Sequence, residues 1–207
     1  MRLEDGSYRL GPALLYLGHA YLTQTDIGAE FERTCRELNP LPTETLVLAA
    51  LDRTHVVYIA KRPGSIPVGI SYEIGMRLPA NCTASGKALL SALSDDEVRR
   101  LYAGRKELPR LTDRSITALP KLLAELATIR SEGCSIDDEE TVKGMICFAT
   151  PVPGRLRREA TAIAVSLVKS TVDDEIRAGT VSSLVNLAGA LSASSRTPTT
   201  VGVVVSE

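Results

Sequence analysis

Tryptophan is absent from this chain of 207 residues, and phenylalanine occurs only twice, so few aromatic rings are available for a core. Hydrophobic residues still make up 44% of the sequence, and the core therefore has to be built from Ala, Val, Leu and Ile. A chain of this length buries roughly 70% of the surface that its unfolded form exposes. It needs neither a metal nor a disulfide to fold.

Histidine and cysteine are also scarce. The chain has two histidines and four cysteines without a Cys-x-x-Cys pair, so we expect no zinc cluster and no cofactor. The N-terminus does not have the pattern of a signal peptide, and no apolar run reaches the ~18 residues that a membrane helix needs. These absences favour a cytoplasmic protein with free thiols.

An excess of positive charge is missing too, since Lys plus Arg is 24, Asp plus Glu is 25 and the net charge is −1. Proteins that bind DNA concentrate positive charge, because phosphate contacts dominate the affinity. The short basic run at Arg155, Arg157 and Arg158 is interpreted as the solvated tip of a hairpin.

What the sequence does contain is clear periodicity. Residues 10–24 carry an apolar stripe at helical spacing, made of Leu10, Leu14, Leu17 and Tyr21. The stripe has two explanations that stay open here: packing on the same chain, or contact with a partner subunit. A second helix is predicted to end near Leu38, before Asn39-Pro40.

Strand and helix patterns then alternate in groups. The strands are predicted at 45–50, 54–60, 67–74, 134–136, 144–153 and 161–169, and the helices at 84–92, 94–102, 118–132 and from 171 onward. Ser94 and Glu97 have the spacing of a capping box, and Gly133 stands where a helix-ending glycine is expected. Strands joined by hairpins predict an antiparallel sheet with helices on its faces, an α+β fold.

Several weak chemical motifs are spread along this fold. The segment Ala84-Ser85-Gly86-Lys87-Ala88 is not a phosphate-binding loop, because the required first glycine and the final Ser or Thr are missing. It is interpreted as a helix N-terminus, whose free N–H groups favour an anion or a polar oxygen. Small polar groups on an otherwise apolar fold are typical of a small-molecule pocket.

The polar candidates each have a plainer explanation. Cys147 lies in an apolar strand and is either a small buried hydrophobe or a thiol that contacts a ligand. Asp137 belongs to a run of four acids, which is typical of a solvated face, but it can also turn inward. A buried Ser166 hydroxyl needs a partner, which a polar ligand could supply.

Two rival functions stay open at this point. One is a small hydrolase that uses Cys147 or Asp137 and needs His55 or another base close to the thiol. The other is an interaction module that binds no ligand. We favour a sensor that is not an enzyme, because the motifs do not supply a nucleophile, a base and an oxyanion hole together.

Three segments carry a family resemblance: Asp5–Gly18, Arg77–Ala88 and Gly133–Pro151. Together they resemble the effector-binding region of IclR-type bacterial transcriptional regulators, beginning at the end of the winged helix-turn-helix. The resemblance implies a GAF-like fold, with a curved antiparallel sheet, helices on both faces and a pocket on the concave face. It divides the chain into the end of the wing and a linker helix (1–24), the effector-binding domain (25–195) and a disordered tail (196–207).

The resemblance also implies a ligand site and partners. A small organic acid or aromatic metabolite would be the effector, a homodimer or tetramer the assembly, and DNA would be contacted only through the winged helix, most of which this chain lacks. We therefore expect no operator binding by the chain alone. The implied ligand-binding residues are Leu78, Ala84, Ser85, Asp137, Met145, Cys147, Ala164 and Ser166. The family has a serine where Ala164 stands, which favours a larger or less polar ligand.

Overall fold

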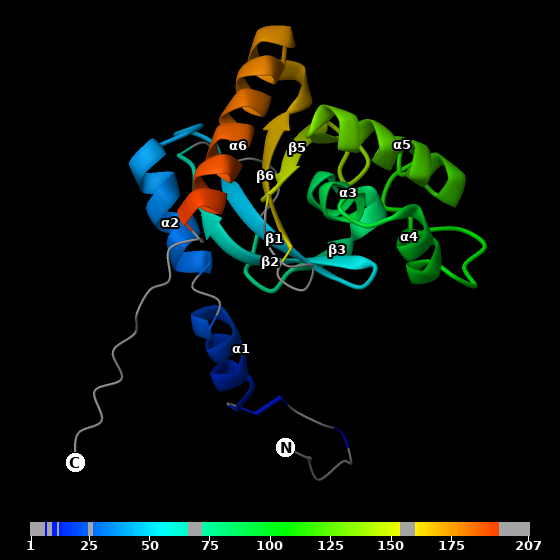
Figure 1. Cartoon of the computed structure of the whole chain (residues 1–207), viewed down its shortest axis with the longest axis horizontal. Coiled ribbons are helices and arrows are strands. Elements are labelled where there is room, and N and C mark those ends of the chain that lie inside the picture. Colours follow the sequence, from blue (N-terminus) through cyan, green and yellow to red (C-terminus); the bar gives the residue numbers. More distant parts are fainter. Residues whose placement is uncertain are drawn as a thin grey trace.

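The computed structural model of the chain describes residues 7, 10, 11, 13–24, 27–65, 72–153 and 160–194. These residues build one six-stranded antiparallel sheet with the strand order β3-β2-β1-β6-β5-β4 (Figure 1). The strands are β1 (Leu46–Asp52), β2 (His55–Arg62), β3 (Arg77–Pro79), β4 (Ser135–Asp138), β5 (Met145–Pro151) and β6 (Thr161–Val168). The α-helices are α1 (Ala13–Gln24), α2 (Ile27–Leu38), α3 (Ala84–Ser91), α4 (Asp95–Leu101), α5 (Leu119–Glu132) and α6 (Asp174–Ser194).

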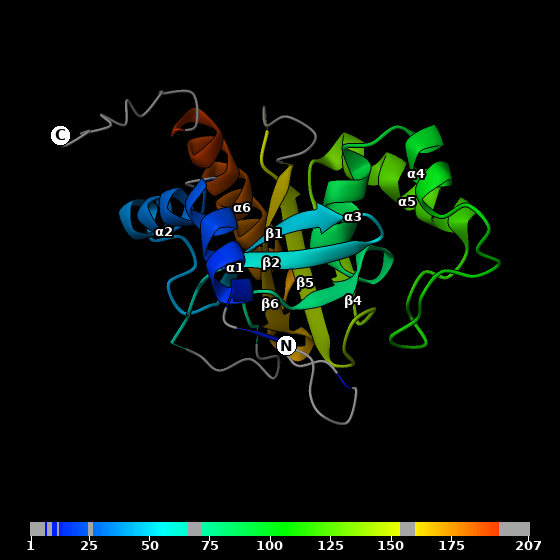
Figure 2. The same cartoon turned by 90° about the horizontal axis from the view of Figure 1, so that it is seen from below.

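Helices cover both faces of the sheet. Figures 1 and 2 show α2 and α6 on one side, while α3, α4 and α5 lie on the other. The expected α+β fold, with a curved antiparallel sheet between two layers of helices, is therefore confirmed. Two short 3₁₀ helices, Ala80–Cys82 and Lys169–Thr171, lead into α3 and toward α6.

The two faces have separate cores, because side chains alternate along each strand. Leu46, Leu48 and Phe148 point toward α2 and α6. Their neighbours Val47 and Ala49 point toward α3 and α5. Each strand therefore contributes one set of residues to a purely structural core and another set to the side that carries the polar motifs.

The start of α3 is shaped by tight packing on the preceding 3₁₀ turn. Thr83 caps the helix, since its hydroxyl accepts a hydrogen bond from the backbone N–H of Gly86 at 3.0 Å. A Cβ atom on Gly86 would lie 2.2 Å from the carbonyl oxygen of Ala80, so only glycine fits there. The capping box at Ser94 and the left-handed Gly133 that ends α5 are confirmed as predicted.

One predicted strand is wrong at its end and lies otherwise outside the described residues. The pattern at 67–74 indicated a strand, but residues 72–74 form none, and the rest of that stretch lies outside the described residues. The third strand is instead the short β3, which pairs with β2 through Leu78 opposite Val56. The basic turn at 155–158 and the tail at 195–207 also lie outside the described residues.

Helix α1 contacts α2 and stands away from the sheet (Figure 1). Leu10 is 82% exposed, Leu14 49% and Leu17 61%, so a large part of each of these members of the apolar stripe is left uncovered by the same chain. The side chain of Tyr21 is not described. None of the described helices is long and apolar enough to cross a membrane.

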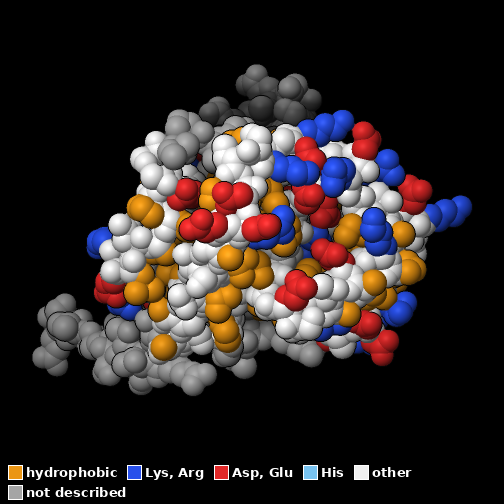
Figure 3. Space-filling view, turned by 90° about the horizontal axis from the view of Figure 1, so that it is seen from above, with side chains coloured by type: hydrophobic (Ala, Val, Ile, Leu, Met, Phe, Trp, Pro, Cys, Tyr) orange, Lys and Arg blue, Asp and Glu red, His pale blue; other side chains and the backbone are white. Residues whose placement is uncertain are grey.

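The surface carries charges of both signs. On the face seen in Figure 3, acidic and basic side chains of the described residues are interspersed, with apolar side chains between them. That face shows no gathering of positive charge of the kind that binds nucleic acid.

Candidate functional site

A row of three polar side chains crosses the sheet. Asp137 on β4 lies directly opposite Cys147 on β5, and Cys147 lies opposite Ser166 on β6. Because directly opposed residues of an antiparallel sheet point to the same face, all three side chains face the start of α3. The sequence predicted each residue separately, and strand pairing brings them together.

A small cavity lies between this row and α3. It is lined by Val47, Tyr58, Tyr72, Thr83, Ala84, Ser85, Asp137, Thr141, Cys147, Ala164 and Ser166. Six of the eight residues implied by the family resemblance are among them. Leu78 and Met145 are not: Leu78 packs against the core on the α3 side from β3, and Met145 pairs with Val168 at the start of β5.

Five lining residues had not been singled out from the sequence. Tyr58 and Val47 belong to alternating strands, so their inward direction could have been found from the period of two. Thr83 could have been recognised as the cap of α3. Tyr72 and Thr141 lie in irregular segments, where no periodicity indicates the direction of a side chain.

Asp137 is buried and held by its own loop. One carboxylate oxygen accepts hydrogen bonds from the backbone N–H groups of Glu140 at 2.6 Å and Thr141 at 3.1 Å, and the other accepts from the Thr141 hydroxyl at 2.6 Å. Burial nevertheless raises the pKa of Asp137, because desolvation outweighs these hydrogen bonds. The acid therefore takes up a proton more readily than an exposed aspartate.

Cys147 is a neutral thiol in this setting. Burial is the main cause that raises its pKa, and the nearby charge of Asp137 adds to it. The Ser166 hydroxyl donates a hydrogen bond to the Cys147 sulfur at 2.9 Å. No histidine is among the lining residues, and the ring of His55 lies 3.3 Å from the hydroxyl of Thr54 at the start of β2. A thiol without a base is not an activated nucleophile.

Two tyrosines fill the remaining space. The Tyr72 hydroxyl forms a short hydrogen bond with Ser166, and the Tyr72 ring packs edge-to-face on Tyr58 with centroids 5.2 Å apart. Burial raises the pKa of both phenols, so both stay protonated. The cavity that is left has a volume of about 10 Å³, the room that one water needs.

Behind the cavity lies a buried cation, Lys87, whose side chain is 0% exposed. Its amine donates to the carbonyl oxygen of Ile136 at 2.6 Å, to Glu125 at 3.2 Å and to Glu140. Burial raises the pKa of Glu140 to about 7, although Lys87 opposes this shift. Lys87 thus ties α3 to the end of β4, and no basic side chain lines the cavity itself.

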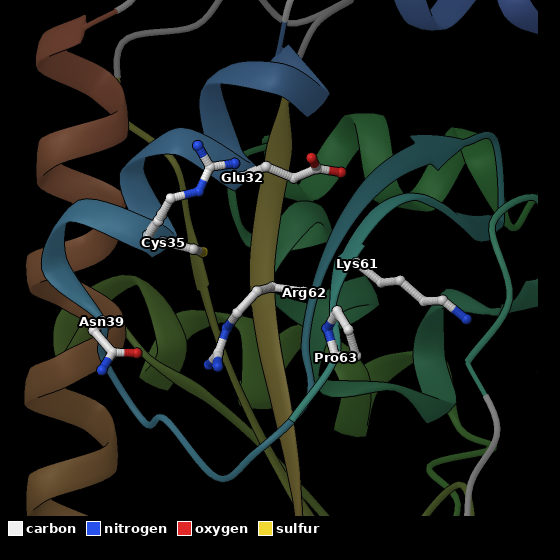
Figure 4. Close-up of a pocket in the computed structure, with 7 residues that line it drawn as sticks. Glu32, Cys35, Asn39, Lys61, Arg62 and Pro63 are labelled. Atoms are coloured by element: carbon white, nitrogen blue, oxygen red, sulfur yellow. The ribbon is translucent and has the colours of Figure 1, made fainter. Parts of the chain in front are cut away.

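A larger hollow of about 390 Å³ lies between α2 and the end of β2 (Figure 4). Two of its three basic side chains are already engaged: the Lys61 amine donates to the carbonyl of Tyr72 at 2.8 Å, and Arg62 donates to backbone carbonyls of the loop after α2. In Figure 4 the ends of Lys61 and Arg62 point away from each other. Burial raises the pKa of the lining thiol, Cys35, to about 11. These groups do not converge on one ligand position.

Among the described residues, no three His, Cys, Asp or Glu side chains come close enough to hold a metal ion. All four cysteines are buried and free. The polar groups around the small cavity are hydroxyls, a thiol, a carboxyl and the first N–H groups of α3. They can hydrogen-bond an uncharged or singly charged organic molecule, and they lack the arrangement that bond cleavage requires.

Comparison with known proteins places the chain among regulators. A family model described as the bacterial transcriptional regulator IclR C-terminal region matches residues 19–193. The chain is 33% identical over 171 residues to the regulator XynR and 35% identical over 163 residues to the regulator KdgR, both of Escherichia coli. These alignments cover 83% and 79% of this chain, and 68% and 62% of the relatives. The chain thus spans about two thirds of the length of these curated relatives.

Solved structures give the same result. The Agobacterium tumefaciens repressor BlcR is 36% identical with a TM-score of 0.74, covering 93% of this chain and 76% of that one. The C-terminal domain of E. coli KdgR is 33% identical with a TM-score of 0.71, over 81% of this chain and 97% of that one. The inducer-binding domain of a PobR double mutant from Acinetobacter, in complex with 3-hydroxybenzoic acid, is 25% identical with a TM-score of 0.66, over 81% and 96%.

Proposed function

This chain belongs to the IclR family of bacterial transcriptional regulators, and on that premise we propose that it binds one small organic effector between α3 and the concave face of the sheet. It is the effector-binding region of a regulator and not an enzyme, since its relatives are transcriptional regulators. The observation that carries the proposal is the row of Asp137, Cys147 and Ser166 facing the first turn of α3.

The chemistry of the lining supports a ligand of one class. No Lys, Arg or His lines the cavity, so a carboxylate group would depend on the N–H groups at the start of α3. Burial raises the pKa of Asp137, and an anion placed opposite it would favour its protonated form further. We infer that the effector is a small aromatic or keto acid, and the PobR complex with 3-hydroxybenzoic acid supports testing hydroxybenzoates first.

The proposed ligand-binding residues fall into two sets. Ala84, Ser85, Asp137, Cys147, Ala164 and Ser166 would contact the effector directly. Leu78 and Met145 lie outside the lining and would contact only a larger ligand.

A thermal-shift screen with hydroxybenzoates and short keto acids tests the proposal, followed by calorimetry. A ligand should raise Tm and be recovered chemically unchanged. Ser166→Ala and Asp137→Asn should weaken its binding at least tenfold. Ser135→Ala is the matched control, because Ser135 is equally buried in the sheet but does not line the cavity. Equal affinity of Ser166→Ala and the parent chain would contradict the proposed site.

We further propose that α1 pairs with the same helix of a second copy and passes the effector signal toward a DNA-binding domain. The exposed Leu10, Leu14 and Leu17 support this, because an unpartnered apolar stripe on a helix is covered by another helix in symmetric dimers. Light scattering should find a dimer, and Leu14→Glu with Leu17→Glu should give a monomer. Ile176→Glu, at an exposed position of α6, is the control and should leave the assembly intact.

A further inference from the structure

The effector cavity is too small for any effector as it stands. Its volume is about 10 Å³, whereas pockets that hold organic ligands measure roughly 300–1,000 Å³. A bound molecule therefore has to displace a side chain. The question is which of the lining residues can leave.

Most of the lining is fixed in the sheet or in α3. Val47, Ala164 and Cys147 lie on paired strands and are small, so their movement would open little space. Of the two large side chains, Tyr58 belongs to β2, which is paired with β1 on one side and β3 on the other. Tyr72 belongs to neither a helix nor a strand.

Tyr72 is held by contacts that a ligand could replace. Its hydroxyl bonds Ser166, the residue at the end of the polar row, and its ring packs edge-to-face on Tyr58. Its backbone is tied to the sheet through the carbonyl oxygen, which accepts a hydrogen bond from the Lys61 amine at 2.8 Å. A phenol in the cavity would make the same two side-chain contacts that Tyr72 makes.

We propose that the Tyr72 side chain is an internal occupant of the effector cavity, and that the effector binds by replacing it. This inference rests on the proposed function and names the residue that sets the affinity and the size of the ligand. A ligand with one aromatic ring and a hydroxyl positioned for Ser166 fits the vacated space. When the Tyr72 side chain leaves, the hydrogen bond between its carbonyl oxygen and the Lys61 amine has to shift as well. Lys61 belongs to β2, the strand that contacts α2.

The probe for the test is p-cresol, which is the tyrosine side chain as a free molecule, with toluene as its analogue that lacks the hydroxyl. Tyr72→Ala should bind p-cresol at least tenfold more tightly than the parent chain does, measured by calorimetry and by the rise in Tm. It should prefer p-cresol to toluene by about 2- to 10-fold, the worth of one hydrogen bond. Adding Ser166→Ala should remove that preference.

A second variant keeps the ring and so avoids loss of folding. Tyr72→Phe lacks only the bond to Ser166, and it should bind p-cresol about 2- to 10-fold more tightly than the parent, because a weaker internal contact has to be broken. Tyr102→Phe is the matched control, since Tyr102 is buried in the same core but does not line the cavity. It should leave the affinity unchanged.

NMR of ¹³C-labelled tyrosine rings then gives a direct readout. The Tyr72 ring signals, assigned with Tyr72→Phe, should shift strongly when p-cresol or a ligand from the metabolite screen binds to the parent chain. If a screened ligand binds through Ser166 while the Tyr72 signals stay unchanged and Tyr72→Phe binds no more tightly, the inference fails and the proposed function stands. If Tyr72→Ala takes p-cresol but the parent chain binds no metabolite, the internal occupant is supported and the proposed function fails.

Discussion

The two faces of the sheet are built from the same strands but from different residue types. Along β6 the side chains toward α2 and α6 are Ile163, Val165 and Leu167, whereas those toward α3 include Ala164 and Ser166. The first set fills its side completely with branched aliphatic groups. The second set leaves room above the strand, and this room is taken up by rings that come from other segments.

This difference separates stability from binding. Large side chains that interdigitate give a close-packed core, in which the removal of a single methylene group lowers the stability of the fold. Small side chains under Tyr58 and Tyr72 give a site whose contents can be exchanged without removing the support. One face can therefore stay rigid while the other changes its occupant.

Two neighbouring residues of β5 point to opposite faces and give the sharpest comparison. Phe148→Ala should lower the free energy of unfolding by about 3–5 kcal/mol, because Phe148 is fully buried on the α2 and α6 side. Cys147→Ala should lower it by less than about 2 kcal/mol and should change ligand affinity instead. Urea unfolding and calorimetry measure both quantities. Equal destabilisation by the two substitutions would contradict the division.

Lys87 is the exception on the α3 side of the sheet, because this charged residue stabilises the fold and does not line the cavity. Lys87→Met should destabilise the fold by about 3–5 kcal/mol, since it leaves Glu140 buried without its cation. Adding Glu140→Gln to Lys87→Met should restore part of the loss, because the uncompensated charge is then gone. If the double variant is less stable than Lys87→Met alone in urea unfolding, the ion pair is not the reason for the effect.

The raised pKa of Glu140 predicts a pH dependence on the same face. In the unfolded chain this group releases its proton near its ordinary pKa of 4.5, but in the folded chain it does so near pH 7. Between these values the folded state holds more protons, so the free energy of unfolding should fall as pH rises, by at most about 3 kcal/mol. The raised pKa of Asp137 acts in the same direction.

Glu140→Gln should flatten this slope between pH 5 and 7 in urea unfolding at fixed ionic strength. Glu125→Gln removes the other carboxylate on Lys87 and should keep the slope, because Glu125 is half exposed at the edge of the cluster. If the pH dependence of the free energy of unfolding persists in Glu140→Gln, another titrating group causes it.

The sequence could predict the parts of this site that local patterns determine. The apolar strand around Cys147 predicted a buried thiol, Ser166 was expected in an alternating strand, and the small residues before Lys87 indicated a helix N-terminus. It could not place Tyr72, because that residue lies where the apolar pattern had predicted a strand and only a three-residue strand follows it. Whether the cavity is open or filled depends on this one ring, and no local rule fixes where a side chain from an irregular segment packs.

The family resemblance implied which residues share the site, but not how they pair across the sheet. Asp137 opposite Cys147 requires the register of β4 on β5, which depends on the turn that includes Glu139 in the left-handed region at φ 63°. Leu78 and Met145 were carried over from the resemblance as well, yet they lie outside the lining of the cavity. A resemblance thus transfers the position of a residue along a strand more reliably than its contacts.

Ala164 gives the smallest predicted effect and bears on ligand choice alone. Ala164→Ser adds a hydroxyl that lines the cavity two residues from Ser166, so the ligand preference should move toward smaller and more polar acids by about 1 kcal/mol, roughly fivefold. The screen with hydroxybenzoates and keto acids measures the change.

Ala162→Ser is the matched control, because Ala162 faces the same side of β6 but does not line the cavity. It should lower stability, since its hydroxyl has no ligand to bond, and leave the order of ligands as it was. If the order of ligand affinities is also unchanged in Ala164→Ser, a hydroxyl at this position does not contact the effector.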